Sequence, residues 1–119
     1  MSKNTPGPWR YSKENGSPTT GQHMIAGAKP GYLAEVRDCG SGCVEANARL
    51  IAAAPELLEA CQTFAEWLRR EDEGFPEEIR FNTPEGEAKW REWYGENLRV
   101  CALAMEKARS AIAKARGDA

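Results

Sequence analysis

The spacing of apolar residues changes near Val44, and this change constrains the fold more than any other feature. Before it, residues 32–38 ("YLAEVRD") alternate with the two-residue period of a half-buried strand. After it, apolar residues recur every three or four positions, which is the period of one face of an α-helix. This first helical stripe comprises Leu50, Ile51, Ala54, Leu57, Leu58, Cys61, Phe64, Ala65 and Leu68. The pattern predicts an α+β chain, with a β-rich segment over residues 1–44 and helices after it.

The β-rich segment contains two further strand-prone runs, at residues 8–12 and 22–28. Asn15-Gly16 and the "KPG" at 29–31 are turn signals between the runs. Three strands joined by tight turns predict a small antiparallel meander. One apolar face of such a sheet needs cover, and the helices are the elements that can supply it.

The first predicted helix spans residues 45–70 and contains Pro55 in its interior. Because the apolar stripe passes through Pro55 without losing phase, the pattern favours one helix kinked there. An interior proline removes one backbone hydrogen bond and its ring clashes with the preceding turn. The alternative places Pro55 at the first position of a new helix, with Glu56 beside the positive helix end.

The second predicted helix spans residues 84–116 and follows an acidic connection over 71–83. Thr83 is expected as the N-cap, with Pro84 at the first helical position. Its apolar stripe comprises Trp90, Trp93, Tyr94, Cys101, Ala104, Met105, Ala108, Ala111, Ile112 and Ala115. Two long helices joined by a loop are expected to lie antiparallel. The whole chain, residues 1–119, is predicted to form a single domain.

Charge and composition narrow the classes of partner. The 16 basic and 18 acidic residues give a net charge of −2, which argues against sequence-independent binding to long nucleic acid. No apolar stretch approaches the ~20 residues that cross a bilayer, and the first residues do not resemble a signal peptide. We therefore expect a cytoplasmic protein without a membrane partner. Cys61 and Cys101 fall on the apolar stripes and are predicted to be buried free thiols.

Nothing in the sequence predicts catalysis, a metal or a cofactor. Nucleophilic catalysis needs a base beside the nucleophile, and the single histidine, His23, lies in a predicted strand. His23 also has no second histidine with which to complete a zinc site alongside Cys39 and Cys43. The chain is therefore expected to act by binding, without enzymatic activity.

Two amides stand in phase with the apolar stripes. Asn47 precedes Leu50 by three positions, and Asn97 lies midway between Trp93 and Cys101. A buried amide is costly without partners, so each should be hydrogen-bonded. The partner is either another part of the protein or a ligand, and the sequence leaves both open.

Four other residues are candidates for ligand binding. Arg109 borders the second stripe, where it either extends its charge to water or grips a phosphate. Trp9 is held between prolines at the start of a strand. Phe81 and Asn82 precede the second helix, where an aromatic ring and an amide either stack a base or pack onto the core.

Two stretches carry a resemblance to known proteins. "TPGPW" at residues 5–9 and "EANARLIAAAPELL" at 45–58 resemble the paired signature of small bacteriophage and prophage proteins. Within that group, the β-then-α layout is similar to the phage Thoeris anti-defence sponge family. Those proteins are small oligomers that sequester cyclic ADP-ribose-type signals, and some bind cyclic oligonucleotides.

The resemblance implies a function that agrees with the absence of catalytic groups. It implies a homo-oligomer, either a dimer or a higher assembly such as a hexamer, that sequesters a cyclic nucleotide immune signal in the host bacterial cytoplasm. The expected ligand-binding residues are Trp9, Asn47, Phe81, Asn82, Asn97 and Arg109. Two alternatives remain: a protein-binding inhibitor of host defence, similar to an anti-CRISPR, whose acidic loop mimics nucleic acid, or a phage accessory protein.

Overall fold

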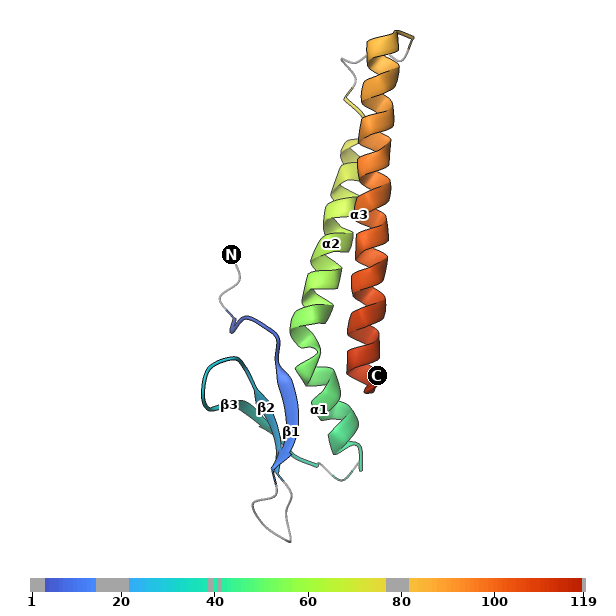
Figure 1. Cartoon of the computed structure of the whole chain (residues 1–119). Coiled ribbons are helices and arrows are strands. Elements are labelled where there is room, and N and C mark those ends of the chain that lie inside the picture. The colour runs from blue at the N-terminus through green and yellow to red at the C-terminus, as the bar shows by residue number, and fades with distance from the viewer. Residues whose placement is uncertain (1–3, 15–21, 39, 41, 77–81, 119) are drawn as a thin grey trace.

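The protein is an elongated α+β chain, as the sequence predicts. The computed structural model describes residues 4–14, 22–38, 40, 42–76 and 82–118. The strands are β1 (Arg10–Glu14), β2 (Gln22–Ala26) and β3 (Tyr32–Val36), and the helices are α1 (Val44–Ala52), α2 (Ala54–Glu73) and α3 (Pro84–Arg116). The sheet and α1 lie at one end, and a hairpin of α2 and α3 extends away from them (Figure 1). The molecule measures 73 × 25 × 22 Å.

The sheet is the predicted antiparallel meander. Its strand order is β1-β2-β3, with Tyr11 opposite Ile25 in one pair and Ile25 opposite Ala34 in the other. Helix α1 covers the sheet, because Ile25 is fully buried against Ala48 and Ala52. The expectation that a helix covers the sheet is therefore confirmed. The turn signal at residues 15–16 lies outside the described residues.

The stretch around Pro55 forms two helices rather than one. Helices α1 and α2 meet at Ala53, whose φ of −85° and ψ of −2° remain right-handed helical. The amide of Ala53 donates to the carbonyls of Arg49 and Leu50, and its own carbonyl accepts from Leu57. This continuity explains why the apolar phase survives the proline.

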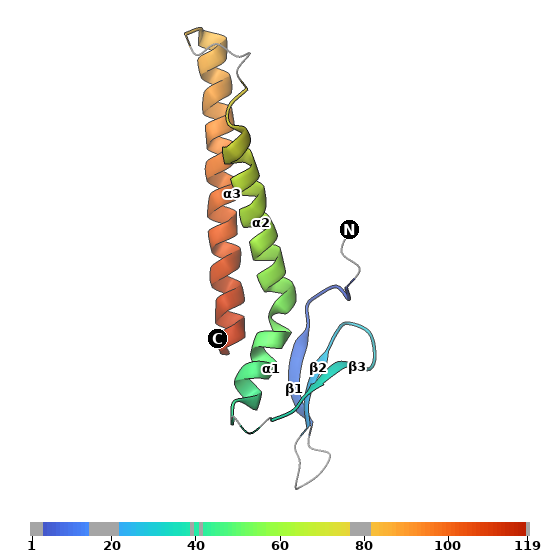
Figure 2. The same cartoon turned by 180° about the vertical axis from the view of Figure 1, so that it is seen from behind.

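The prediction of a single helix over 45–70 kinked at Pro55 is therefore corrected. Pro55 lies in the first turn of α2, where a missing backbone N–H costs no helical hydrogen bond. Figures 1 and 2 show the chain changing direction between α1 and α2. Because the proline ring would clash with a preceding helical turn, the break falls just ahead of it.

Helix α3 has the predicted bounds, and the Thr83 side chain accepts a hydrogen bond from the Gly86 amide at 3.0 Å. The antiparallel packing of α2 on α3 is also confirmed (Figure 1). The contact uses small residues, with Ala60 of α2 and Ala104 and Ala111 of α3 buried. Helix α2 continues to Glu73, so the connection predicted to begin at residue 71 begins three residues later, at Gly74.

Most bulky side chains of the helical hairpin stay outside this contact. Among the described residues, the largest fully buried side chains are Ile25 and Asn97. The prediction of a buried thiol is wrong for Cys61, which is exposed, while Cys101 is half-buried. The reason is that α2 turns Ala60, rather than its bulky stripe, toward α3.

Within the described part of the chain, no helix has the length and apolarity needed to span a membrane.

Candidate functional site

The two motif stretches of the sequence meet in space beside the start of α2. A Cβ added to Gly7 would lie 2.7 Å from Cβ of Pro55, so the backbone of "TPGPW" packs directly on the proline. Trp9 donates from Nε1 to the Thr5 carbonyl at 3.1 Å and is half-buried beside Ile25. Both motifs therefore build the junction between the sheet and the helices.

A cavity of about 500 Å³ opens at this junction. Its lining includes Glu56 and Glu59, and among the described residues the Oε2 atom of Glu56 is buried without a hydrogen-bond partner. The other oxygen, Oε1, accepts from Lys114 Nζ at 2.7 Å, and Lys114 also donates to the Trp9 carbonyl at 2.9 Å. Since Lys114 is engaged by Glu56, and Lys107 is engaged by Glu59 at 2.9 Å, this cavity disfavours an anionic ligand.

A second cavity, of about 490 Å³, lies where the end of α2 meets α3, and we call it the α2–α3 cavity. The rings of Phe75 and Trp93 meet edge to face in its lining, with centroids 5.9 Å apart. Three cations and two carboxylates also line it. Among the described residues, the lining consists of Arg70, Phe75, Pro76, Lys89, Glu92, Trp93, Glu96 and Arg99.

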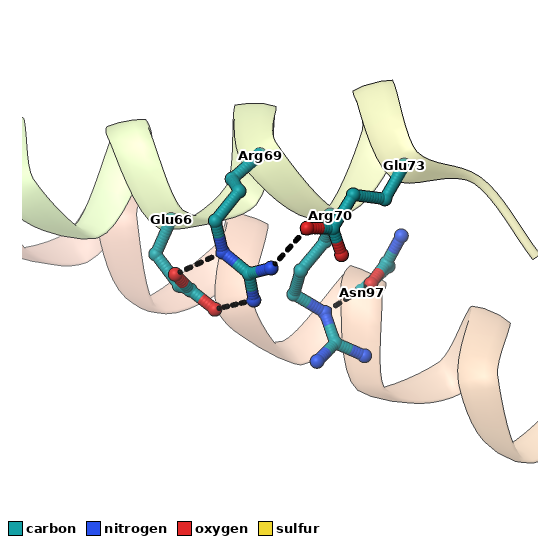
Figure 3. Close-up of polar contacts among 5 residues, drawn as sticks. All are labelled: Glu66, Arg69, Arg70, Glu73 and Asn97. Carbon is teal, nitrogen blue, oxygen red and sulfur yellow. Dashed lines mark hydrogen bonds and ion pairs between the residues drawn. The ribbon is translucent and has the colours of Figure 1, made fainter.

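Asn97 fixes the position of one of these cations. The side chain is only 2% exposed, which confirms the predicted burial. Its Oδ1 accepts from Nε of Arg70, and its Nδ2 donates to Glu71 Oε1 at 2.9 Å. Figure 3 shows Arg70 reaching from α2 to Asn97 on α3. The amide is thus hydrogen-bonded within the protein, and it orients the guanidinium of Arg70.

The neighbouring arginines differ in how firmly they are held. Arg69 is clamped between Glu66, at 2.7 Å and 2.9 Å, and Glu73, at 2.8 Å (Figure 3). The hydrogen bond from Arg69 is the main cause that lowers the pKa of Glu66. Within the described residues, the Arg70 side chain forms no hydrogen bond other than the one to Asn97, so its Nη groups can donate to a ligand.

Arg99 belongs to the same cavity and pairs with a carboxylate one turn earlier. Its Nη2 donates to Glu96 at 2.8 Å, and this hydrogen bond is the main cause that lowers the pKa of Glu96. The Arg99 side chain is 70% exposed, so water screens the pair strongly. An incoming phosphate can therefore compete for the guanidinium.

The five predicted ligand-binding residues that the structure describes do not come together in one chain. Trp9 and Asn47 lie at the sheet end, and Asn47 is exposed rather than on the buried face of α1. Asn82 is exposed just before α3, a helix of 33 residues and about 50 Å. Arg109 is exposed toward the other end of that helix, and Phe81 lies outside the described residues. Of the five described residues, Asn97 alone borders a cavity suited to an anion, through Arg70.

The sequence reasoning missed Arg70, Phe75, Lys89 and Arg99. Arg70 and Asn97 stand 27 positions apart on different helices. Their contact follows from the register of the antiparallel hairpin, which the periodicity of either helix alone does not fix. Phe75 comes from the connection after α2, where no periodicity applies.

The single histidine is part of the sheet core. His23 is 9% exposed, and its Nδ1 lies 2.7 Å from the Tyr11 hydroxyl. The two rings stack with centroids 5.8 Å apart, and burial raises the pKa of Tyr11. This pair packs under α1 and stabilises the sheet. Among the described residues, no group of three or more His, Cys, Asp or Glu side chains has the arrangement of a metal site.

Comparison with known proteins gives one match. The whole chain, residues 1–119, matches the family model described as Salmonella phage P22 protein Y8K6. No curated protein and no solved structure matches the chain. The family match supports the prediction of a small phage protein.

Proposed function

Given that the chain belongs to the Salmonella phage P22 protein Y8K6 family, we propose that this phage protein binds a cyclic nucleotide immune signal and holds it unchanged. The ligand class is that of cyclic ADP-ribose isomers and cyclic oligonucleotides. Sequestration of this kind requires a binding site and no catalytic group. The observation that carries the proposal is the α2–α3 cavity, in which aromatic rings and guanidinium groups occur together.

The cavity has the size and chemistry that such a ligand needs. Its volume of about 490 Å³ falls within the range of ordinary small-molecule sites. The ring of Trp93 can stack on a base, and base–aromatic stacking contributes about 1–3 kcal/mol. Arg70 and Arg99 can donate paired hydrogen bonds to phosphate oxygens, which is the recognition that a planar guanidinium favours.

The two carboxylates in the lining add selectivity. Glu92 and Glu96 oppose a highly charged anion, since like charges disfavour each other at short range. A ligand with two phosphates and ribose hydroxyls suits this mixture better than inorganic polyphosphate does. Its hydroxyl groups can donate to the carboxylates while its phosphates accept from the arginines.

Calorimetry tests the proposal with a matched pair of variants. We expect heat with at least one member of a panel of cyclic ADP-ribose isomers and cyclic di- and trinucleotides. Arg99→Gln should weaken that binding by about 10-fold or more, because it removes a charged donor. Arg91→Gln is the control, since Arg91 is equally exposed and paired with Glu87, yet does not line the cavity.

Mass spectrometry then tests whether the ligand is changed. Heat denaturation of the complex should release the ligand with its original mass. Absence of heat across the whole panel, or equal binding by the two arginine variants, would show that this cavity is not the nucleotide site. Release of a cleaved ligand would show that the protein is an enzyme.

A further inference from the structure

The chain exposes far more surface than a compact protein of its size. Its accessible surface is 8824 Å², whereas a compact monomer of 13.1 kDa exposes about 6,400 Å². The radius of gyration is 20.9 Å, against about 13.5 Å for a compact domain of this length. The excess of about 2,400 Å² exceeds the ~800 Å² per partner that a stable interface buries.

Helix α3 carries two parallel apolar seams with the same seven-residue period. The first contacts α2 and includes Asn97, Ala104 and Ala111, all buried. The second lies one position further along, with Leu98, Met105 and Ile112 exposed by 54%, 42% and 44%. Residues at alternate spacings of three and four complete it, in the order Tyr94, Leu98, Cys101, Met105, Ala108 and Ile112. A seven-residue period of this kind is the pattern of a helix that packs along another helix.

Helix α2 repeats the arrangement on the same side of the hairpin. Ala60 is buried against α3, and the following positions form a second seam of Leu57, Cys61, Phe64 and Leu68. In an antiparallel pair, the residues that follow the contact seam on each helix lie on one common side. The seams of α2 and α3 thus form a single uncharged surface, which we call the second apolar face.

We propose that two copies of the chain pack their second apolar faces together about a two-fold axis, forming a four-helix bundle. The face contains no charged side chain that would demand a complementary partner, so it matches a second copy of itself. The excess surface is large enough for such an interface. Gly95 flanks the face, and a Cβ there would meet nothing within 4 Å in one chain, which leaves room for close approach by the second copy.

The interface leaves the α2–α3 cavity open. Lys89 and Glu96 of that cavity occupy positions nearly opposite the second seam around α3, at 100° per residue. The dimer therefore stands independently of the proposed nucleotide binding, and a test of one does not decide the other.

Sedimentation velocity with a matched pair of variants tests the dimer. The wild-type chain should have twice the mass of 13.1 kDa, about 26 kDa. Met105→Glu should weaken dimerisation by about 100-fold or more, because it buries carboxylates in an apolar interface. Leu103→Glu is the control: Leu103 lies on the same helix and is 45% exposed, but it points away from the second apolar face.

Thiol reactivity of the wild-type protein gives a second readout that needs no variant. Cys61 and Cys101 lie within the face, so a maleimide should label them at least about 10-fold more slowly than the exposed Cys43. Labelling should become rapid in Met105→Glu while circular dichroism shows the helices intact. A monomeric wild type, labelling of Cys61 as fast as Cys43, or an assembly that Met105→Glu leaves unchanged would overturn the proposal.

Discussion

Asn97 provides the sharpest test of how the hairpin is held together. Its amide is 2% exposed and bridges Arg70 and Glu71 of α2 (Figure 3). Two substitutions distinguish the stabilisation by its hydrogen bonds from the stabilisation by the space that its side chain fills. Asn97→Ala removes the bonds and leaves a space, whereas Asn97→Leu removes the bonds and fills the space with an apolar side chain.

The structure sets the expected magnitudes. A hydrogen bond to a charged group contributes about 1.5–3 kcal/mol when it is fully buried. Here Arg70 is half-buried and Glu71 is exposed, so both can turn to water when the amide is lost. We therefore expect Asn97→Ala to lower the free energy of unfolding by about 2 kcal/mol in total. Asn97→Leu should lower it by less than about 1 kcal/mol, because an apolar side chain at this position restores packing.

Urea unfolding followed by circular dichroism measures both differences. All chains must be compared at one protein concentration, since association changes apparent stability. Both variants should also weaken nucleotide binding by about 10-fold, because each releases Arg70 from its fixed orientation. If Asn97→Ala stays within about 0.5 kcal/mol of the wild type, the amide does not stabilise the hairpin and the reasoning fails.

Three further predictions follow from other contacts. Gly7→Ala should destabilise the fold by about 1–3 kcal/mol in urea unfolding, because its Cβ would lie 2.7 Å from Pro55, and an unchanged midpoint would contradict that packing. Thr83→Ala should cost about 1 kcal/mol in the same assay through loss of the α3 cap, whereas Thr83→Ser should retain it. The pKa values of Glu66 and Glu96 lie below their ordinary value of 4.5. The two carboxylates therefore contribute to the free energy of unfolding above pH 4.5, and this contribution is lost as the pH falls through the lowered pKa values. Replacing both by Gln should flatten the loss of stability below pH 4.5, and an unchanged acid titration would show that their arginine pairs do not matter.

The elements were predictable where local chemistry decides them. The cap at Thr83 and the proline after it fix the start of α3, and alternation fixes β3. The sequence could not decide whether the helix is kinked or broken at Ala53, because both a kink and a new helix preserve the apolar phase. Most of the candidate site could not be predicted from the sequence, since Arg70 meets Asn97 only through the register of two helices far apart in sequence.

Helix α1 shows why a correctly identified apolar stripe can still predict the wrong burial for a residue on it. Its apolar residues occur on more than one side, and the sheet takes the side with Ala48 and Ala52. Leu50 is consequently 53% exposed, and Asn47, in phase with it, is exposed as well. Small residues form the contact between α1 and the sheet because they let the helix approach the sheet closely. Periodicity identifies an apolar side, but side-chain size decides which side packs first.

The exposure of Cys61, which the sequence predicts to be buried, is accounted for by the proposed dimer. The bulky stripe of α2 predicted a buried thiol, yet within one chain the alanine side packs on α3, and Cys61 and Leu68 stay exposed. A sequence that leaves Leu68 exposed, and Leu57 and Phe64 only half-buried, loses hydrophobic stabilisation of about 25 cal/mol per Å² left in water. A second copy would bury those residues and return Cys61 to an apolar environment. In the proposed dimer the stripe would be buried, and the exposed side chains of the single chain would form the interface.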